Sequence, residues 1–416
     1  MRWTFAITSL SLFMFALDRL VVTTALPAIE SDIGGGVAAL AWTVNAFTLT
    51  FSVLLLTGGA LGDRFGRRRV FVAGIALFTL GSAAAALAPT AGALIAARAL
   101  QGVGGAVIMP VSLAILMAAT PAARRGTVLG AWAAVAAAAA TAGPVAGGAL
   151  AATLSWHWIF WLNVPIGLAL IPLALRRLDE SHGPEARLDV RGVTISAAAL
   201  LALVWGVIAG EGVAIAAGAL GLVTFVAHER RAAAPMLPMQ LFADREFATA
   251  STVSVLAYGG LFGALFVLGQ SFGTDPLEAA LHLLPMTAVM AIGAPAAGAL
   301  TDRIGARPLM LTALLTCAVA LTLLAAGDKP SAAEMLLLGA GASCLFAPIQ
   351  ATLIAAPGAA VALRELGGVL GVAVLAAGTG LGIAAAAVAT AALVVLLEQL
   401  YAVAPGIRRV EAANAR

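Results

Sequence analysis

The chain has 416 residues, of which 62% are hydrophobic and 10% are charged, and its mean hydropathy is +1.04. Soluble domains carry about 25% charged residues, and no globular core of this length could bury so much apolar surface, so a soluble protein is excluded. The net charge of +3 gives no indication of nucleic-acid binding. The two cysteines lie inside apolar runs and the four histidines are scattered, so neither a disulfide framework nor a metal site is predicted.

Fourteen apolar runs of membrane-spanning length follow one another along the chain. They cover 4–29, 39–61, 70–88, 91–118, 127–152, 157–175, 192–210, 212–228, 247–270, 278–300, 308–326, 333–355, 361–377 and 379–402. These runs are continuous and lack the alternation of barrel strands, so we predict an all-α polytopic membrane protein. The first run is too long for the apolar core of a signal peptide and is interpreted as a retained helix.

The stretch 192–228 is interpreted as two short helices. As one helix, its 37 residues would overshoot a hydrocarbon core of about 30 Å at about 1.5 Å per residue. The polar and flexible sequence Gly210-Glu211-Gly212 supplies a turn near its middle. The amphipathic stretch 228–246 that follows is interpreted as a linker at the membrane surface.

The basic residues are distributed as a membrane topology predicts. If the N-terminus is cytoplasmic, 20 of the 23 basic residues fall on the cytoplasmic side, with Arg364 counted in the loop before the thirteenth span. Only Lys329 falls on the other side, and Arg19 and Arg98 lie within spans. Because cytoplasmic loops carry an excess of Lys and Arg, this split indicates fourteen spans with both termini in the cytoplasm.

One sequence pattern occurs twice. Gly-Ala-Leu-Gly-Asp-Arg-Phe-Gly-Arg-Arg-Arg at 59–69 follows the second span, and Gly-Ala-Leu-Thr-Asp-Arg-Ile-Gly-Ala-Arg at 298–307 follows the tenth. Parallel repeats related by an axis along the membrane normal are typical of one large transporter class. We therefore predict a six-helix bundle over 1–178, two inserted helices with linkers over 179–246, and a compressed six-helix bundle over 247–416. The alternative is a tight turn whose arginines only follow the positive-inside rule.

Asp18 and Arg98 are the main candidates for function, because a charge within a span costs about 2.5–3.5 kcal/mol on insertion scales. A carboxylate that moves between an apolar environment and contact with an arginine binds and releases a proton. Arg19 is either a further partner in this proton coupling or a side chain that snorkels to the membrane surface. The alternative for Asp18 and Arg98 is a static ion pair that holds two helices together.

Several short motifs resemble those of the major facilitator superfamily, in particular its fourteen-span branch of drug:proton antiporters. The segments that carry this resemblance are Leu17–Pro27 in the first span, Gly59–Arg69 after the second, Arg98–Gly104 in the fourth, Gly143–Gly148 in the fifth and Trp156–Gly167 at the sixth. Leu20 and Thr23 depart from the branch, which tends to have Thr and Asn at these positions.

The resemblance implies roles for further residues. Spans one and four of the family pack side by side, which would bring Asp18 and Arg98 together. A cytoplasmic latch between the halves is implied for Gly59, Asp63, Arg64, Gly66 and Arg67, with Asp302 and Arg303 in the second copy. A hinge or proton-tight seam in span five is implied for Gly143, Pro144, Gly147 and Gly148. By analogy, the cavity-facing candidates for substrate binding are Asn45, Gln101, Trp132, Tyr258, Gln270 and Gln350.

The resemblance implies a proton-coupled antiporter that exports hydrophobic or amphipathic drugs across the bacterial cytoplasmic membrane. The alternative is an exporter of an endogenous secondary metabolite or lipid-like compound. The expected partners are a small hydrophobic substrate and the bilayer, the protein is expected to be a monomer, and no cofactor is expected besides the coupling proton. The chain has no Gly-x-x-x-x-Gly-Lys-[Ser/Thr] loop, which disfavours an ATP-driven pump. The predicted spans contain no His-Glu-x-x-His and no complete Gly-x-Ser-x-Gly motif, which disfavours an intramembrane enzyme or a sensor.

Overall fold

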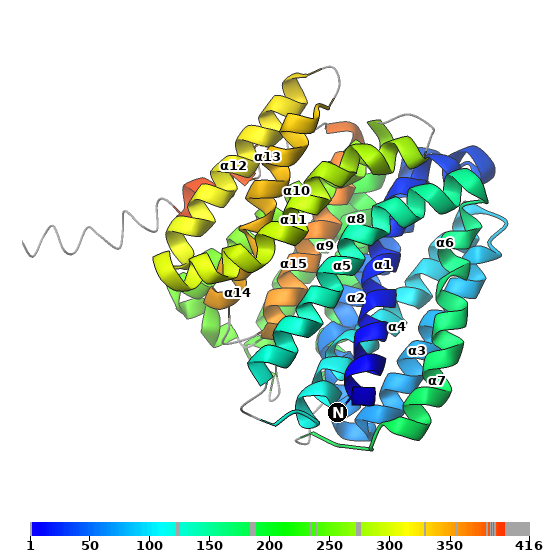
Figure 1. The fold of residues 1–416 in the computed structure, drawn as a ribbon. Helices are drawn as coiled ribbons and strands as arrows, with labels where there is room; N and C mark the ends of the chain where they lie inside the picture. Colours follow the sequence, from blue (N-terminus) through cyan, green and yellow to red (C-terminus); the bar gives the residue numbers. More distant parts are fainter. Residues whose placement is uncertain are drawn as a thin grey trace, which may run out of the picture.

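The computed structural model describes residues 2–121, 125–183, 189–232, 235, 237, 239–271, 276–327, 330–353, 357–379, 382, 384, 386 and 388–395. Within these residues the chain forms helices joined by short turns and contains no strand. Figure 1 shows the long helices packed side by side. A helix satisfies its own backbone hydrogen bonds, which a chain that crosses lipid requires. The predicted all-α membrane architecture is confirmed.

The amino-terminal part contains α1 (Arg2–Ile33), α2 (Gly36–Phe65), α3 (Arg67–Ala86), α4 (Ala91–Ala118), α5 (Arg125–Thr153), α6 (His157–Trp161) and α7 (Asn163–Arg177). The turns before α2 and α3 depend on Gly35 and Gly66, whose φ angles of 104° and 100° favour glycine. Thr90 caps α4 by accepting a hydrogen bond from the Ala93 amide. α4 packs against α2 and α3, and α1 lies against α5.

A hairpin of two helices follows, formed by α8 (Val190–Ala209) and α9 (Gly212–Glu229). Gly210, with φ of 70°, makes the turn at the position expected from the sequence. α8 packs against α2 and α15, and α9 packs against α8. The apolar side chains of Val213, Leu220 and Val223 on α9 are exposed, as expected for a helix that faces lipid.

The carboxyl-terminal part contains η2 (Met239–Ala243), α10 (Arg245–Ser271), α11 (Pro276–Ile304), α12 (Ala306–Ala326), α13 (Ala332–Ser343), α14 (Phe346–Thr352), α15 (Pro357–Val374) and η3 (Leu375–Thr379). Glycines let α10 and α15 approach closely, since a Cβ added to Gly371 would overlap the carbonyl oxygen of Gly259. Ser331 and Glu334 form a capping box at the start of α13.

The amino- and carboxyl-terminal parts meet along several helix pairs. α2 packs against α15, α5 against α11, and α1 against α10 and α11. The buried core is shared as well, because Phe266 and Val372 belong to the same apolar cluster as Leu17 and Val21 of α1. Residues on α1, α2, α10 and α15 are therefore placed to interact across the interface between the two parts.

The predicted span count is matched in large part. Eleven helices of the described residues are long and apolar enough to cross a membrane. α5 and α11, each of 29 residues, coincide with the runs predicted at 127–152 and 278–300. The last predicted run, 379–402, lies partly outside the described residues. Fourteen spans stays a prediction, and so does the division of the chain at 178 and 246.

Candidate functional site: two buried charge clusters

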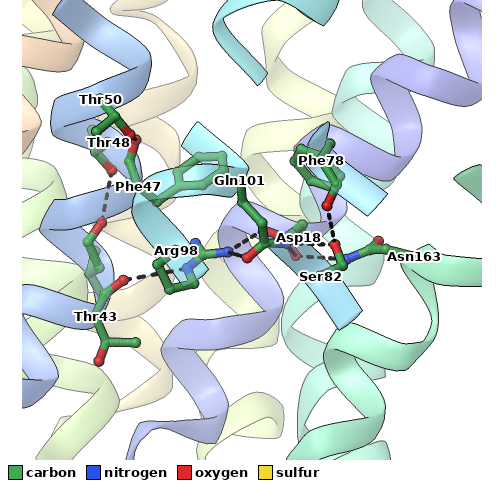
Figure 2. Close-up of polar contacts among 11 residues, drawn as sticks. Asp18, Thr43, Phe47, Thr48, Thr50, Phe78, Ser82, Arg98, Gln101 and Asn163 are labelled. Atoms are coloured by element: carbon green, nitrogen blue, oxygen red, sulfur yellow. Dashed lines mark hydrogen bonds and ion pairs between the residues drawn. The ribbon is translucent and has the colours of Figure 1, made fainter. Parts of the chain in front are cut away.

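Asp18 and Arg98 form an ion pair between α1 and α4, and both side chains are almost completely buried. Figure 2 shows the network around them, in which Arg98 Nη1 donates to Asp18 Oδ2 and, at 2.8 Å, to Gln101 Oε1. Asp18 Oδ1 accepts hydrogen bonds from Gln101 Nε2 at 3.1 Å and from Asn163 Nδ2 at 2.7 Å. Gln101 Nε2 also donates to Ser82 Oγ at 2.7 Å. One carboxylate thus receives three side-chain donors in a water-poor environment.

Arg98 also has partners that do not involve the carboxylate. Its Nε donates to the Thr43 carbonyl oxygen at 3.4 Å, and its guanidinium lies 4.3 Å from the centroid of the Phe47 ring. A cation over an aromatic face is stabilised even where water is excluded. These contacts hold the Arg98 guanidinium in place independently of the Asp18 carboxylate.

The sequence analysis identified Asp18 and Arg98 but assigned Gln101 to substrate binding. The structure places Gln101 inside the ion-pair network, because it lies one helical turn from Arg98 on the same face of α4. Asn163, the first residue of α7, is a partner that was not expected. A signal was available, since an asparagine at the start of an apolar helix needs a polar partner when it is buried.

A second cluster joins the two parts of the molecule. Arg19 donates two hydrogen bonds to the Glu365 carboxylate, from Nη1 to Oε1 at 2.9 Å and from Nη2 to Oε2 at 2.7 Å. Arg364 donates to Glu365 Oε1 from Nη2 at 2.7 Å and from Nε at 3.0 Å. Glu365 is fully buried, so its charge is compensated by one arginine from α1 and one from α15.

This cluster corrects one expectation, for Arg364, and disfavours one of the two alternatives for Arg19. Arg364, counted in a cytoplasmic loop, lies within α15, where the neighbouring buried carboxylate compensates its charge. Without Arg364, 19 basic residues remain on the predicted cytoplasmic side. Arg19 binds Glu365 and does not extend to the membrane surface, because the carboxylate lies within its reach across the interface.

The residues of the predicted latch lie at the turn between α2 and α3. Asp63 Oδ1 accepts from Arg67 Nε at 2.8 Å, and the Asp63 carbonyl oxygen accepts from the Gly183 amide. Glu180, after α7, accepts from the Arg68 amide at 2.8 Å. In the described residues, Asp63 therefore interacts across the turn between α2 and α3 and with the segment after α7. The latch between halves stays a prediction, and the Asp302 side chain, its counterpart in the second copy, lies outside the described residues.

The glycines in and next to this motif differ in whether a side chain would fit between α2 and α4. A Cβ on Gly59 would lie 3.5 Å from Pro110, which is an ordinary contact, whereas a Cβ on Gly62 would lie 2.8 Å from Val111. At Gly58, one residue before the predicted motif, a Cβ would overlap the Ala106 carbonyl oxygen. The close approach of α2 and α4 therefore depends on Gly58 and Gly62 and not on Gly59. Two further residues of the predicted latch are arginines. The Arg64 guanidinium lies 5.3 Å from the centroid of the Phe65 ring, and Arg303 is exposed.

The span-five motif lies where α5 meets α1. A Cβ on Gly143 would lie 2.9 Å from the Leu20 side chain, and a Cβ on Gly147 would lie 2.5 Å from the Val21 carbonyl oxygen. The helix continues through Pro144 and Gly148, so the motif does not end it. Because α5 also packs against α11, the motif lies in a helix that contacts both parts of the molecule. Its role as a seam stays a prediction.

The other substrate-binding candidates lie in different environments. Asn45 is fully buried, and neither atom of its amide has a hydrogen-bond partner among the described residues. Trp132 packs with Leu12 and Leu116 on the amino-terminal side. Gln270 donates to the carbonyl oxygen of Phe266 within α10. The remaining two are Tyr258, which stacks with Phe262, and Gln350, whose side chain lies outside the described residues.

One group of described side chains has metal-ligating atoms close together: Asp189, His228 and Glu229 at the open end of the α8–α9 hairpin. Hydrogen bonds account for most of these atoms. Asp189 caps α8 through the Gly192 amide and binds His228 Nε2 at 2.9 Å, and Glu229 Oε2 accepts from the Leu237 amide. Burial raises the pKa of Asp189, but the Gly192 amide and His228 outweigh it and bring the pKa below its usual value. These contacts favour a structural role, in which the group fastens the ends of the two helices.

The model of the Major Facilitator Superfamily matches residues 8–264 and, separately, residues 247–404. The tetracenomycin C resistance and export protein of Streptomyces glaucescens is 35% identical over 326 residues, which make up 74% of this chain and 61% of that protein. The multidrug resistance protein Stp of Mycobacterium tuberculosis is 34% identical over 396 residues, 88% of this chain and 74% of Stp. The fold is similar to that of the E. coli xylose transporter XylE in a partially occluded inward-open conformation, with a TM-score of 0.65 at 15% identity over 94% of this chain and 97% of that chain.

Proposed function

Because this chain belongs to the major facilitator superfamily, we propose that it is a proton-coupled antiporter that exports hydrophobic or amphipathic drugs across the cytoplasmic membrane. The names of the relatives that mention drug resistance and export support this proposal. The observation that carries it is the buried network of Asp18, Arg98, Gln101 and Asn163 between transmembrane helices. On this proposal the protein is a multi-pass carrier rather than an enzyme, acts as a monomer, and has both termini in the cytoplasm.

Asp18 is the proposed proton-binding group. When a proton binds to one of its oxygens, the negative charge that holds Arg98 disappears, and Arg98 retains the Gln101 side-chain oxygen, the Thr43 carbonyl and the Phe47 ring. The contact between α1 and α4 is then weaker, because the pair of opposite charges is replaced by hydrogen bonds from the Arg98 cation to uncharged oxygens. A change in helix packing that exposes Asp18 to the other side of the membrane would release the proton there.

Exchange with a drug requires that proton binding and drug binding favour different conformations. Asp18 and Arg19 are neighbours on α1, and Arg19 contacts α15 of the other part. A shift of α1 on protonation would therefore alter the interface where an apolar substrate is expected to bind. We propose this shared helix as the physical link between proton and drug.

Drug susceptibility in an efflux-deficient bacterial host tests the proposal. Expression of the wild-type chain is expected to raise the inhibitory concentration of tetracenomycin C or of other aromatic antibiotics in a panel. Everted membrane vesicles from the same cells should accumulate the drug when a proton gradient is imposed, and a protonophore should abolish the accumulation. Unchanged susceptibility to the whole panel, together with no accumulation in vesicles, would refute drug export and favour an endogenous metabolite or lipid-like compound as the substrate.

A further inference from the structure

The centre of the molecule carries an excess of positive charge. Away from the first and last turns of the described helices, the arginine and carboxylate side chains are Asp18, Arg19, Arg98, Arg364 and Glu365. Three are arginines and two are carboxylates. All five belong to the two clusters between and beside α1, α4 and α15, so any ligand bound among these helices experiences a net charge of +1 when both carboxylates are ionised.

The charges differ in what they present to a ligand. The Asp18 and Arg98 side chains are 0% and 2% exposed, so a ligand cannot contact this pair in the present conformation. Glu365 is also 0% exposed, but its two partners are not, with 15% of the Arg19 side chain and 16% of the Arg364 side chain exposed. The accessible part of this cluster therefore belongs to the two arginine side chains, while the carboxylate that holds them in place is fully buried.

Aromatic rings surround these guanidinium groups. Arg19 lies 5.8 Å from the ring centroid of Phe51 on α2 and 5.4 Å from that of Phe262 on α10. Arg364 lies 5.9 Å from the ring centroid of Tyr258, which stacks on Phe262. Rings from both parts of the molecule lie beside the two guanidinium groups, so these groups belong to the interface between the parts and not to the lipid-facing side.

We propose that the substrates of this transporter are amphipathic aromatic anions, which carry a carboxylate, sulfonate or phenolate group, and that Arg19, Arg364 and Glu365 determine this preference. The inference rests on the proposed function and narrows its substrate class. A guanidinium carries five N–H donors, and Glu365 accepts two from each of Arg19 and Arg364. The two positive charges attract an oxyanion, and the rings around them accept an aromatic body. A cationic drug at the same place would meet two arginines and no accessible carboxylate.

Transport of two dyes with the same xanthene scaffold tests the inference, fluorescein as the anion and rhodamine 123 as the cation. The full-length protein is reconstituted into liposomes, and the uptake of each dye driven by an imposed proton gradient is measured for the wild type and three variants. R364Q removes one positive charge, E365Q removes the buried negative charge, and R191Q removes an exposed arginine at the start of α8 as the matched control. Size-exclusion chromatography checks that each variant is folded.

Wild-type protein is expected to favour fluorescein. At an effective dielectric constant of about 20, removal of one unit of charge several ångströms from the dye should change the fluorescein-to-rhodamine uptake ratio by more than about tenfold. The ratio should fall in R364Q, rise in E365Q and stay constant in R191Q, and two opposite shifts cannot both result from misfolding. A preference for rhodamine 123, or a ratio that neither central variant changes, would overturn the inference while transport itself stands. If neither dye nor any drug of the susceptibility panel is transported, the proposed function fails and the inference fails with it.

Discussion

Replacement of Asp18 by asparagine separates proton coupling from folding. The two side chains have nearly the same shape, but asparagine does not bind a proton in the physiological range. In the structure, the Asp18 carboxylate accepts hydrogen bonds from Arg98, Gln101 and Asn163. An amide in its place keeps one oxygen as an acceptor and turns an NH2 group toward one of these donors, so about one charge-assisted hydrogen bond is lost.

The expected loss of unfolding free energy is about 1.5–3 kcal/mol, the value of one hydrogen bond to a charged group. A larger loss is not expected, because Arg98 retains the Gln101 oxygen at 2.8 Å, the Thr43 carbonyl at 3.4 Å and the Phe47 ring. Proton coupling, in contrast, is expected to vanish. Without a titrating group in the network, substrate-driven proton movement should fall to the leak of empty liposomes.

The assay measures proton flux in proteoliposomes that contain a pH-sensitive dye, with an outward gradient of a drug that the wild-type protein transports. Asp32→Asn is the matched control, since Asp32 lies at the exposed end of the same helix and binds only the Trp156 indole nitrogen, at 2.8 Å, among the described residues. This variant should retain wild-type flux. Binding of the drug should persist in Asp18→Asn. Flux at the wild-type level in Asp18→Asn would refute the assignment and make Glu365, a buried carboxylate within α15, or Glu398, which lies outside the described residues, the next candidate.

Four further predictions follow from the contacts of single residues. Arg98→Ala is expected to lower the free energy of unfolding by about 3–5 kcal/mol, more than Asp18→Asn, because it leaves a buried carboxylate without its ion-pair partner; chemical unfolding in detergent would measure both. Gly66→Ala is expected to lower the melting temperature, because φ is 100° there and the added Cβ would lie 2.8 Å from the Glu180 carboxyl carbon, whereas Gly92→Ala, with open space around it, should not. Asp189→Ala is expected to remove about 1 kcal/mol through the loss of the α8 cap. Because the folded pKa of Asp189 lies below the usual 3.8, that contribution should be present above about pH 4 and be lost as the pH falls through the lower folded pKa, which melting curves at several pH values would detect. Reporter fusions after Arg177 and after Arg409 should both report cytoplasm, and a periplasmic signal from the second would mean that the last region contains an odd number of spans.

The helices and the pair Asp18 and Arg98 could be predicted from the sequence, because each is indicated by a short stretch of the chain. Each apolar run is long enough to be recognised without knowledge of its neighbours, and most observed helices begin and end within a few residues of the predicted ones. Asp18 and Arg98 stood out as charges within such runs. The need of Asn163 for a polar partner was also visible in the sequence, but its contact with Asp18 could not be predicted, because it depends on how α7 is rotated against α1.

The second cluster, Arg19, Arg364 and Glu365, could not be predicted from the sequence for a different reason. Arg19 and Glu365 are separated by 346 positions in the chain, and neither residue indicates the other. Arg364 and Glu365 also lie near the start of a short and glycine-rich run, where hydropathy alone assigns adjacent charges to a loop. Only the close packing of α15 against α10, through Gly371 and Gly259, brings these charges into the interior. Tertiary contacts here override the local pattern.

The two clusters have one helix in common, and this arrangement constrains any coupling mechanism. Consecutive residues of a helix point about 100° apart, so Asp18 and Arg19 face different neighbours from the same turn of α1. Asp18 contacts α4 and α7 of its own part, whereas Arg19 contacts α15 of the other part. A rotation or shift of α1 that loosens one ion pair must therefore change the geometry of the other. Because Arg19 reaches Glu365 through two short hydrogen bonds at 2.9 and 2.7 Å, a displacement of about 1 Å would break at least one of them. On the proposed mechanism, protonation of Asp18 and opening of the interface would therefore be linked through α1, without a longer chain of intermediates.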